Sequence, residues 1–159
     1  MLRVRLLRKL VAVWIGLWAS AVVAGAVAKL TLDSEDDPAA RQFSLVTVFE
    51  GTDFRPTTRN LTASRSLTLF GGTRLDLRRS AASSEIHLDL TTVMGGTDVT
   101  VPDTWVVTVV GRPLIGGHAV QVADPATLAA DATRLVISAR TVMGGLRVHA
   151  RPILAAASA

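Results

Sequence analysis

The stretch Leu69-Phe70-Gly71-Gly72-Thr73-Arg74-Leu75-Asp76-Leu77 contains the pattern that decides the fold of this chain. Two bulky apolar residues precede a glycine pair, and alternating apolar and polar residues follow it. Alternation with a period of two is typical of a β-strand. Glycine suits a corner because it adopts positive φ and lets neighbouring backbones approach closely. The stretch therefore predicts a strand, a sharp corner and a second strand.

The same pattern occurs five times. The copies are Val48-Phe49-Glu50-Gly51, Leu69-Phe70-Gly71-Gly72, Val93-Met94-Gly95-Gly96, Leu114-Ile115-Gly116-Gly117 and Val142-Met143-Gly144-Gly145. Counted between the last glycines of the copies, the spacings are 21, 24, 21 and 28 residues, which is the range in which one repeat forms one supersecondary unit. We expect an all-β, repeat-built β-solenoid or β-roll of short strands, with the Gly-Gly corners of successive coils in register. A β-sandwich of ordinary hairpin turns is the alternative interpretation.

The repeat has two irregularities, one in its first copy and one in its longest spacing. The first copy has Glu50 in place of a glycine, and terminal repeats are often atypical because one side lacks a neighbour. The longest spacing contains the segment 124–133, the only downstream stretch in which we expect helical character.

Composition limits the fold and the chemistry. A length of 159 residues with 49% hydrophobic residues suffices for one domain and an appendage. Aromatic residues make up 4%, so the interior must be mainly aliphatic. The chain has no cysteine, which excludes disulfides and thiolate metal sites but leaves the cellular compartment open.

The net positive charge of the chain comes from its N-terminus. Residues 1–29 contribute +5, and the remaining 130 residues, with 12 Arg and 13 acidic residues, contribute −1. A domain that binds nucleic acid needs clustered positive charge of its own. We therefore expect no nucleic-acid partner.

The N-terminal segment has the properties of a membrane anchor. Leu10 to Ala28 form 19 uncharged, mostly apolar residues, about 28 Å as a helix, behind four basic residues. The positive-inside rule predicts a single-pass plasma-membrane protein with a cytoplasmic N-terminus and an extracytoplasmic β domain. A cleaved signal peptide is the alternative, because Ala26-Val27-Ala28 resembles a cleavage site.

These features divide the chain into four parts. We expect a transmembrane anchor or uncleaved signal-like segment at 1–29, an acidic linker at 30–42, a β domain at 43–152 and a disordered tail at 153–159.

The β domain resembles a known family in its glycine corners and the strands that follow them. The series Leu69 to Arg78, then Val93 to Pro102, then Trp105-Val106-Val107 is similar to the LiaF-like C-terminal domain of cell-wall-active antibiotic response proteins. The resemblance covers roughly residues 43–151. It implies an all-β repeat domain attached to membrane helices and linked, in some members, to envelope-stress signalling through a sensor kinase and response regulator.

Few residues suggest a reaction. His87, His118 and His149 are evenly spaced, by 31 residues each, but occupy different positions in the repeat, so stacking does not predict a shared metal site. Asp53, Arg74, Asp98 and Ala119 share the position two residues past the last corner glycine, which indicates a solvated position with loose requirements.

Asp76 is singled out by the family resemblance, with Arg78 and Arg79 as candidate partners, although structural capping accounts for it equally well. No nucleophile elbow or phosphate-binding loop is present. We expect no catalytic, cofactor-binding or metal-binding residues and no enzymatic activity.

Two functional hypotheses follow. The first is a membrane-anchored interaction or regulatory module of a bacterial-type envelope, linked to cell-wall stress, with the lipid membrane bound through Leu10 to Ala28 and a protein partner or self-association through the β domain. The second is an exported wall-polymer or glycan-binding domain without catalysis.

Overall fold

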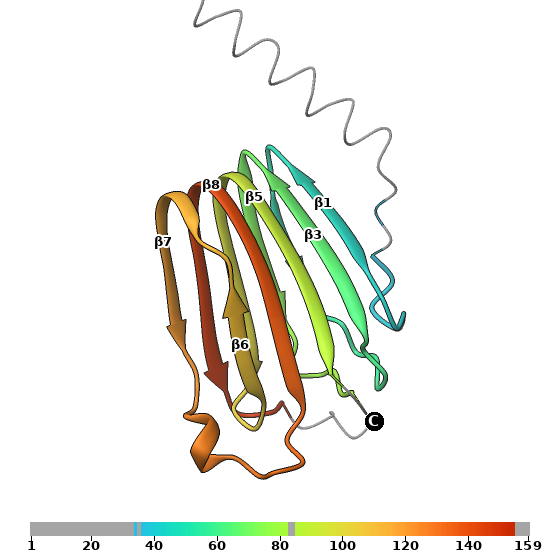
Figure 1. Ribbon diagram of the computed structural model, residues 1–159. Helices are drawn as coiled ribbons and strands as arrows, with labels where there is room; N and C mark the ends of the chain where they lie inside the picture. Colours follow the sequence, from blue (N-terminus) through green and yellow to red (C-terminus); the bar gives the residue numbers. More distant parts are fainter. Residues whose placement is uncertain (1–33, 35, 83–84, 155–159) are drawn as a thin grey trace, which may run out of the picture. The chain divides into compact units, whose positions relative to one another are not determined.

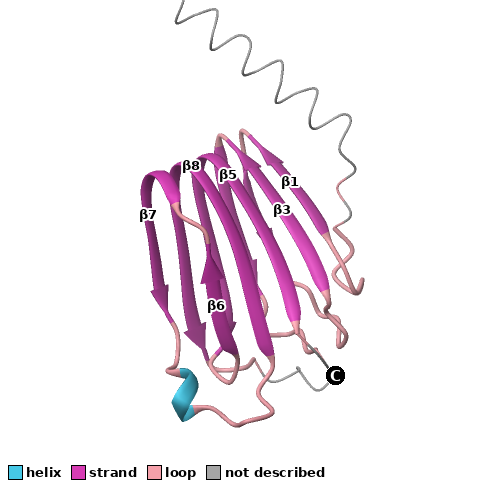
Figure 2. Cartoon of the chain, viewed as in Figure 1, coloured by secondary structure: helices cyan, strands magenta, loops and turns pink. Residues whose placement is uncertain are grey.

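The computed structural model describes residues 34, 36–82 and 85–154, all within one compact unit of the chain, residues 34–159 (Figure 1). The elements are β1 (Ser44–Val48), β2 (Gly51–Phe54), β3 (Ala63–Leu69), β4 (Gly71–Asp76), β5 (Ile86–Pro102), β6 (Val106–Val110), β7 (Pro113–Gln121), the 3₁₀ helix η1 (Pro125–Thr127) and β8 (Arg134–Arg151). Figure 2 shows that strands dominate this unit. The prediction of a mainly β domain is confirmed.

The eight strands belong to one open sheet that folds over at the glycine corners (Figure 1). Each repeat supplies a first arm before its corner and a second arm after it. β1, β3, β6 and residues 86–92 and 134–141 form the first arms. β2, β4 and residues 96–102, 145–151 and 117–121 form the second arms. All pairings between the described strands are parallel, which contradicts the hairpin sandwich, since hairpin neighbours run antiparallel.

The repeats do not stack in sequence order. The third repeat, β5, pairs along nearly its whole length with the fifth, β8. The fourth repeat, β6 and β7, pairs with the other side of β8. The expectation that successive repeats are neighbours is therefore wrong for repeats 3 and 4, because the chain places repeat 4 at the end of the stack and then returns with repeat 5 to fill the space between them.

The two glycines of each corner have different roles. A Cβ on Gly71, Gly95, Gly144 or Gly116 would collide with the backbone carbonyl oxygen of the corner residue in the adjacent repeat. For all four, that residue lies toward repeat 1. A Cβ on the second glycines, such as Gly72 and Gly96, meets nothing closer than ordinary contact. Only the first glycine is thus required for close stacking.

The same geometry explains Glu50. It occupies the first-glycine position of repeat 1, which ends the stack within the described residues, so its Cβ has no further repeat to collide with. Glutamate does not readily adopt the φ of +141° found at Gly95, and in repeats 1 and 2 the positive φ lies one residue earlier, at Phe49 and Phe70. The two phenyl rings stack with centroids 4.9 Å apart.

The core lies between the two arms. Inward-facing residues of both arms form one aliphatic cluster, with Leu75, Ile86, Val99, Ile137 and Val148 fully buried. The composition predicts this aliphatic interior. Trp105 and the pair Phe43 and Phe54 are its buried aromatic members.

Other expectations have mixed outcomes. The segment 124–133 contains only the three-residue η1, which is capped by the Asp124 side chain and ends because the backbone becomes extended at Leu128. No helix among residues 34, 36–82 and 85–154 is long and apolar enough to cross a membrane. The anchor expected at Leu10 to Ala28 lies outside the described residues, as do most of the predicted tail and the start of the linker.

Candidate functional site

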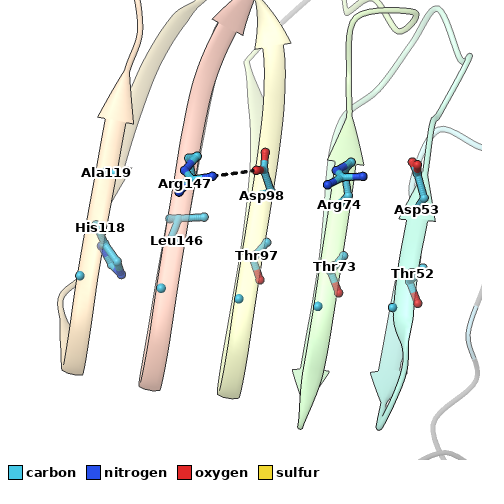
Figure 3. A pocket seen from close by; sticks show the side chains of 15 residues that line it. Thr52, Asp53, Thr73, Arg74, Thr97, Asp98, His118, Ala119, Leu146 and Arg147 are labelled. Carbon is cyan, nitrogen blue, oxygen red and sulfur yellow. Dashed lines mark ion pairs between the residues drawn. The ribbon is translucent and has the colours of Figure 1, made fainter.

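A groove of about 790 Å³ crosses the second arms of all five repeats (Figure 3). Each repeat lines it with three consecutive residues, beginning with the second corner glycine. Because the strands are in register, equivalent residues form straight rows across the sheet. The repeat thus builds one continuous surface from five copies of a short segment.

Glycine forms the floor of the groove. Gly51, Gly72, Gly96, Gly145 and Gly117 make one row, and none of them is excluded from carrying a Cβ by its neighbours. Packing therefore does not account for the second glycine of the pair. Its effect is to leave backbone, rather than side chains, at the bottom of the groove.

A row of alternating charges runs beside the glycine row. In spatial order its members are Asp53, Arg74, Asp98, Arg147 and Ala119 (Figure 3). The Arg147 guanidinium lies 3.8 Å from the Asp98 carboxylate. Alternating cross-strand charges attract each other, and like charges would repel. The interpretation of this position as loosely constrained is therefore incomplete.

Arg147 is not among the candidates that the sequence pattern indicates. It lies two residues past Gly145, the same offset that identified Asp98, so the signal was present. In sequence order, however, Ala119 separates the charged members and hides the alternation. Only the exchange of repeats 4 and 5 in space brings Arg147 beside Asp98.

His149 joins Asp98 to a second row of the same face. Its Nδ1 lies 3.4 Å from Asp98 Oδ1, and its Nε2 lies 3.0 Å from Thr100 Oγ1. A carboxylate, an imidazole and a hydroxyl in this order resemble the connectivity of a hydrolase triad. Thr100 is buried, and the backbone amides around it are used in the ladders on both sides of β5 and β8. The contacts from Asp98 through His149 to Thr100 link β5 to β8 across this face.

Two further acid and base pairs extend the face toward repeats 1 and 2. Asp53 accepts two hydrogen bonds from the Arg55 guanidinium, at 2.9 and 3.1 Å, and this donation lowers the pKa of the carboxyl. Asp76 accepts from Arg78 at 2.7 and 2.9 Å and also from the Arg78 backbone N–H at 3.2 Å. The guanidinium hydrogen bonds lower the pKa of Asp76 against the effect of its burial. Of the two arginines expected near Asp76, the structure pairs it with Arg78.

The three histidines lie apart. His87 is on a first arm, 3.2 Å from Glu85, and His149 is on a second arm. His118 takes the inward position of repeat 4, with Nε2 3.3 Å from Thr141 Oγ1. In the described part of the chain, no three His, Asp or Glu residues come together as a metal site.

Inside the corner, beneath the groove, lies a threonine network that the sequence analysis also missed. Threonines five residues apart face each other across the corner, Thr47 with Thr52, Thr68 with Thr73 and Thr92 with Thr97, at Oγ1 separations of 2.9, 2.7 and 2.9 Å. Thr73 also donates to Thr47 at 3.1 Å. These hydroxyls satisfy one another in a buried position and hold the two arms at a fixed separation.

Comparison of the chain with protein-family models, curated proteins and solved structures finds no match.

Proposed function

We propose that this protein is a single-pass, membrane-anchored interaction and regulatory module of a bacterial-type cell envelope, linked to the response to cell-wall stress. In this proposal the β-solenoid-like domain lies outside the plasma membrane and binds another protein without catalysis. The observation that carries the proposal is the groove with a glycine floor and an alternating row of charges. Asp98 in this row pairs with Arg147, and Asp53 pairs with the adjacent Arg55, so these carboxylates do not converge on one point.

The groove suits an extended ligand. It crosses four strand-to-strand intervals, about 19 Å at roughly 4.8 Å each. Asp98 and Arg147 offer an acceptor and a donor along one side, and the bare backbone lets a ligand approach closely. The stress-response assignment is supported by the resemblance of Leu69 to Arg78 and Val93 to Pro102 to the LiaF-like domain, and the membrane location by Leu10 to Ala28.

The experiment that tests this proposal places a photo-crosslinking residue in the full chain in its membrane. Arg74 lies in the groove, whereas Arg65 is exposed on the other arm of the same repeat. We expect adducts with another protein from position 74 and none from position 65. Equal labelling at the two positions, or none at either, would count against a partner site in the groove.

Sidedness is tested separately. Reporters active in only one compartment are fused after Pro152, and we expect signal from the extracytoplasmic reporter. Signal from the cytoplasmic reporter would contradict the proposed topology and would bring the domain to the side on which a kinase's catalytic portion lies.

The second candidate is an exported wall-polymer or glycan-binding domain without catalysis. It is favoured by the unbroken length of the groove, which suits a repetitive polymer as well as a peptide. Retention of the protein on isolated wall material, lost in an Arg74→Glu and Arg147→Glu double variant, would support this candidate over the first.

A further inference from the structure

The two ends of the stack differ in how they close the core. One inward-facing row of the second arms runs across all five repeats, and its exposed fractions are 6% for Phe54, 0% for Leu75, Val99 and Val148, and 43% for Val120. The same row of core positions is thus sealed at repeat 1 and open at repeat 4.

At repeat 1 the end is covered by the protein itself. Phe54 packs against Phe43 with ring centroids 4.9 Å apart, and both are buried. The preceding chain also reaches this end, where the Ser34 hydroxyl donates to the Ser44 carbonyl at 3.3 Å.

At repeat 4 the end is a bare strand edge. Among the described strands, β6 and β7 pair only with β8, so their outer backbone edge has no partner there. Large apolar side chains are exposed along it, with exposed fractions of 55% for Val110, 77% for Leu114 and 55% for Ile115. An exposed, apolar strand edge is a template for another chain.

The charge of this edge favours a second copy as the partner. Neither β6 nor β7 contains an Asp, Glu, Lys or Arg, and exposed Arg112, between the two strands, is the single Asp, Glu, Lys or Arg of residues 106–121. In a two-fold contact a surface meets itself, so any net charge would be set against the same charge. With one formal charge in the sixteen residues 106–121, this apolar edge keeps such repulsion small and is complementary to itself.

Glu50 excludes the other way of joining two copies. In a head-to-tail contact, repeat 1 of one copy would continue the sheet beyond repeat 4 of another. A Cβ at the first-glycine position of a repeat points at the carbonyl oxygen of the adjacent repeat on the side of repeat 1. Positions 71, 95, 144 and 116 must therefore be glycine. A side chain at position 50 would meet the Gly116 carbonyl in the same manner. Growth into an open filament is thereby blocked, and closed pairing remains.

We propose that the open end formed by β6 and β7 is a homodimer interface, in which two copies of this chain join their sheets about a two-fold axis. The axis reverses the partner's strands, so the new pairing is antiparallel, unlike the parallel pairing within each copy. Val120 of each copy is covered in the dimer, and the core becomes continuous across ten repeats. A second copy of the chain is then one partner of the proposed interaction module. This assignment rests on the proposed function in one respect, that the β domain acts by binding protein.

The test is sedimentation of the full chain in density-matched detergent, with and without single substitutions. Val120→Lys places a charge at the interface, and Val142→Lys places one at an equally exposed valine, 46% against 43%, on the corner of β8 away from the edge. We expect dimers for the wild type and for Val142→Lys. For Val120→Lys we expect the dimer dissociation constant to rise at least roughly tenfold.

Val110→Lys is a second interface variant that does not touch the row of core positions containing Val120, and thermal unfolding checks that each variant is folded. Dissociation by both interface variants supports the proposal. A monomeric wild type, whether the edge is free or covered by another segment, overturns it. So does a wild type that grows beyond dimers with concentration, or a dimer unaffected by either substitution. Photo-crosslinking from position 74 is unaffected by these outcomes, so failure of the dimer is distinguishable from failure of the groove.

Discussion

Arg147 and Asp98 lie on adjacent strands with 3.8 Å between guanidinium and carboxylate, although the whole of repeat 4 separates them in the sequence. Their contact depends on β8 entering between β5 and the strands of repeat 4. The order of the repeats in space therefore determines which charges meet along the groove.

Engineered disulfides test this order directly, because the natural chain contains no cysteine. Adjacent strands lie about 4.8 Å apart and second neighbours about 10 Å, whereas a disulfide requires Cα atoms within about 7 Å. We expect a disulfide in the Asp98→Cys, Arg147→Cys variant and none in the Asp98→Cys, Ala119→Cys variant, as measured by mobility on non-reducing gels. The reverse result would restore the sequential order of repeats.

Alanine substitutions separate the two corner glycines. Gly95 has φ of +141° and its Cβ would collide with the Gly71 carbonyl, so Gly95→Ala should lower the free energy of unfolding by roughly 3 kcal/mol or more. The Cβ of Gly96→Ala would lie 3.8 Å from the Gly145 carbonyl oxygen, an ordinary contact, and should change stability by less than about 1 kcal/mol. Chemical denaturation measures both, and equal losses would contradict the assignment of separate roles.

The ion pair between Asp76 and Arg78 should make the free energy of unfolding fall at acidic pH. The Arg78 hydrogen bonds lower the pKa of Asp76 below its ordinary value of 3.8. A carboxyl with a lowered folded pKa contributes stability above its unfolded pKa and loses it as the pH falls through the folded value. Asp76→Asn should therefore cost about 1–3 kcal/mol at neutral pH and reduce the loss of stability below about pH 4.

Urea denaturation at a series of pH values measures the effect of Asp76→Asn. Asp131→Asn, at an exposed loop position, is the control and should leave the pH profile unchanged. A parallel displacement of the Asp76→Asn curve at every pH would mean that the acid dependence arises elsewhere.

The threonine network makes a fourth prediction. Thr73→Val keeps the shape of a buried side chain but removes the hydroxyl that bonds Thr68 and Thr47, so it should cost about 1–3 kcal/mol. Thr73→Ser retains the hydroxyl and should cost less. Thr104→Val, at an exposed turn position, should have little effect in the same denaturation experiment. If Thr73→Val left the free energy of unfolding unchanged, the threonine hydroxyls would make no net contribution to stability.

The sequence predicts the local structure well because each corner is encoded by neighbouring residues. The glycine pair, the two apolar residues before it and the alternation after it are sufficient to predict strand, corner and strand. Glu50 could also be recognised as the mark of a terminal repeat. The functions of the two glycines could not be separated, because both look alike until the adjacent backbone is in place.

The stacking order could not be predicted for a different reason. Repeats 4 and 5 have the same local pattern. The residues around Gly117 and Gly145 therefore do not reveal which of these two glycines lies beside Gly96. The groove's alternating charges and the link from Asp98 through His149 to Thr100 both depend on that order. Both features therefore depend on long-range strand pairing. Counting residues from each corner identifies which side chains share a position in the repeat, but not which of them are neighbours.

The position of β8 also has a consequence for how the chain is made. β6 and β7 pair with β8 alone among the described strands, so residues 106–121 lack their native pairing partner until residues 134–151 have emerged from the ribosome. During this interval an apolar segment is without its native pairing, and such segments are prone to aggregate. A protein interrupted near residue 133 would keep three stacked repeats and a fourth without its native neighbour, so only the last repeat to be made completes the stack.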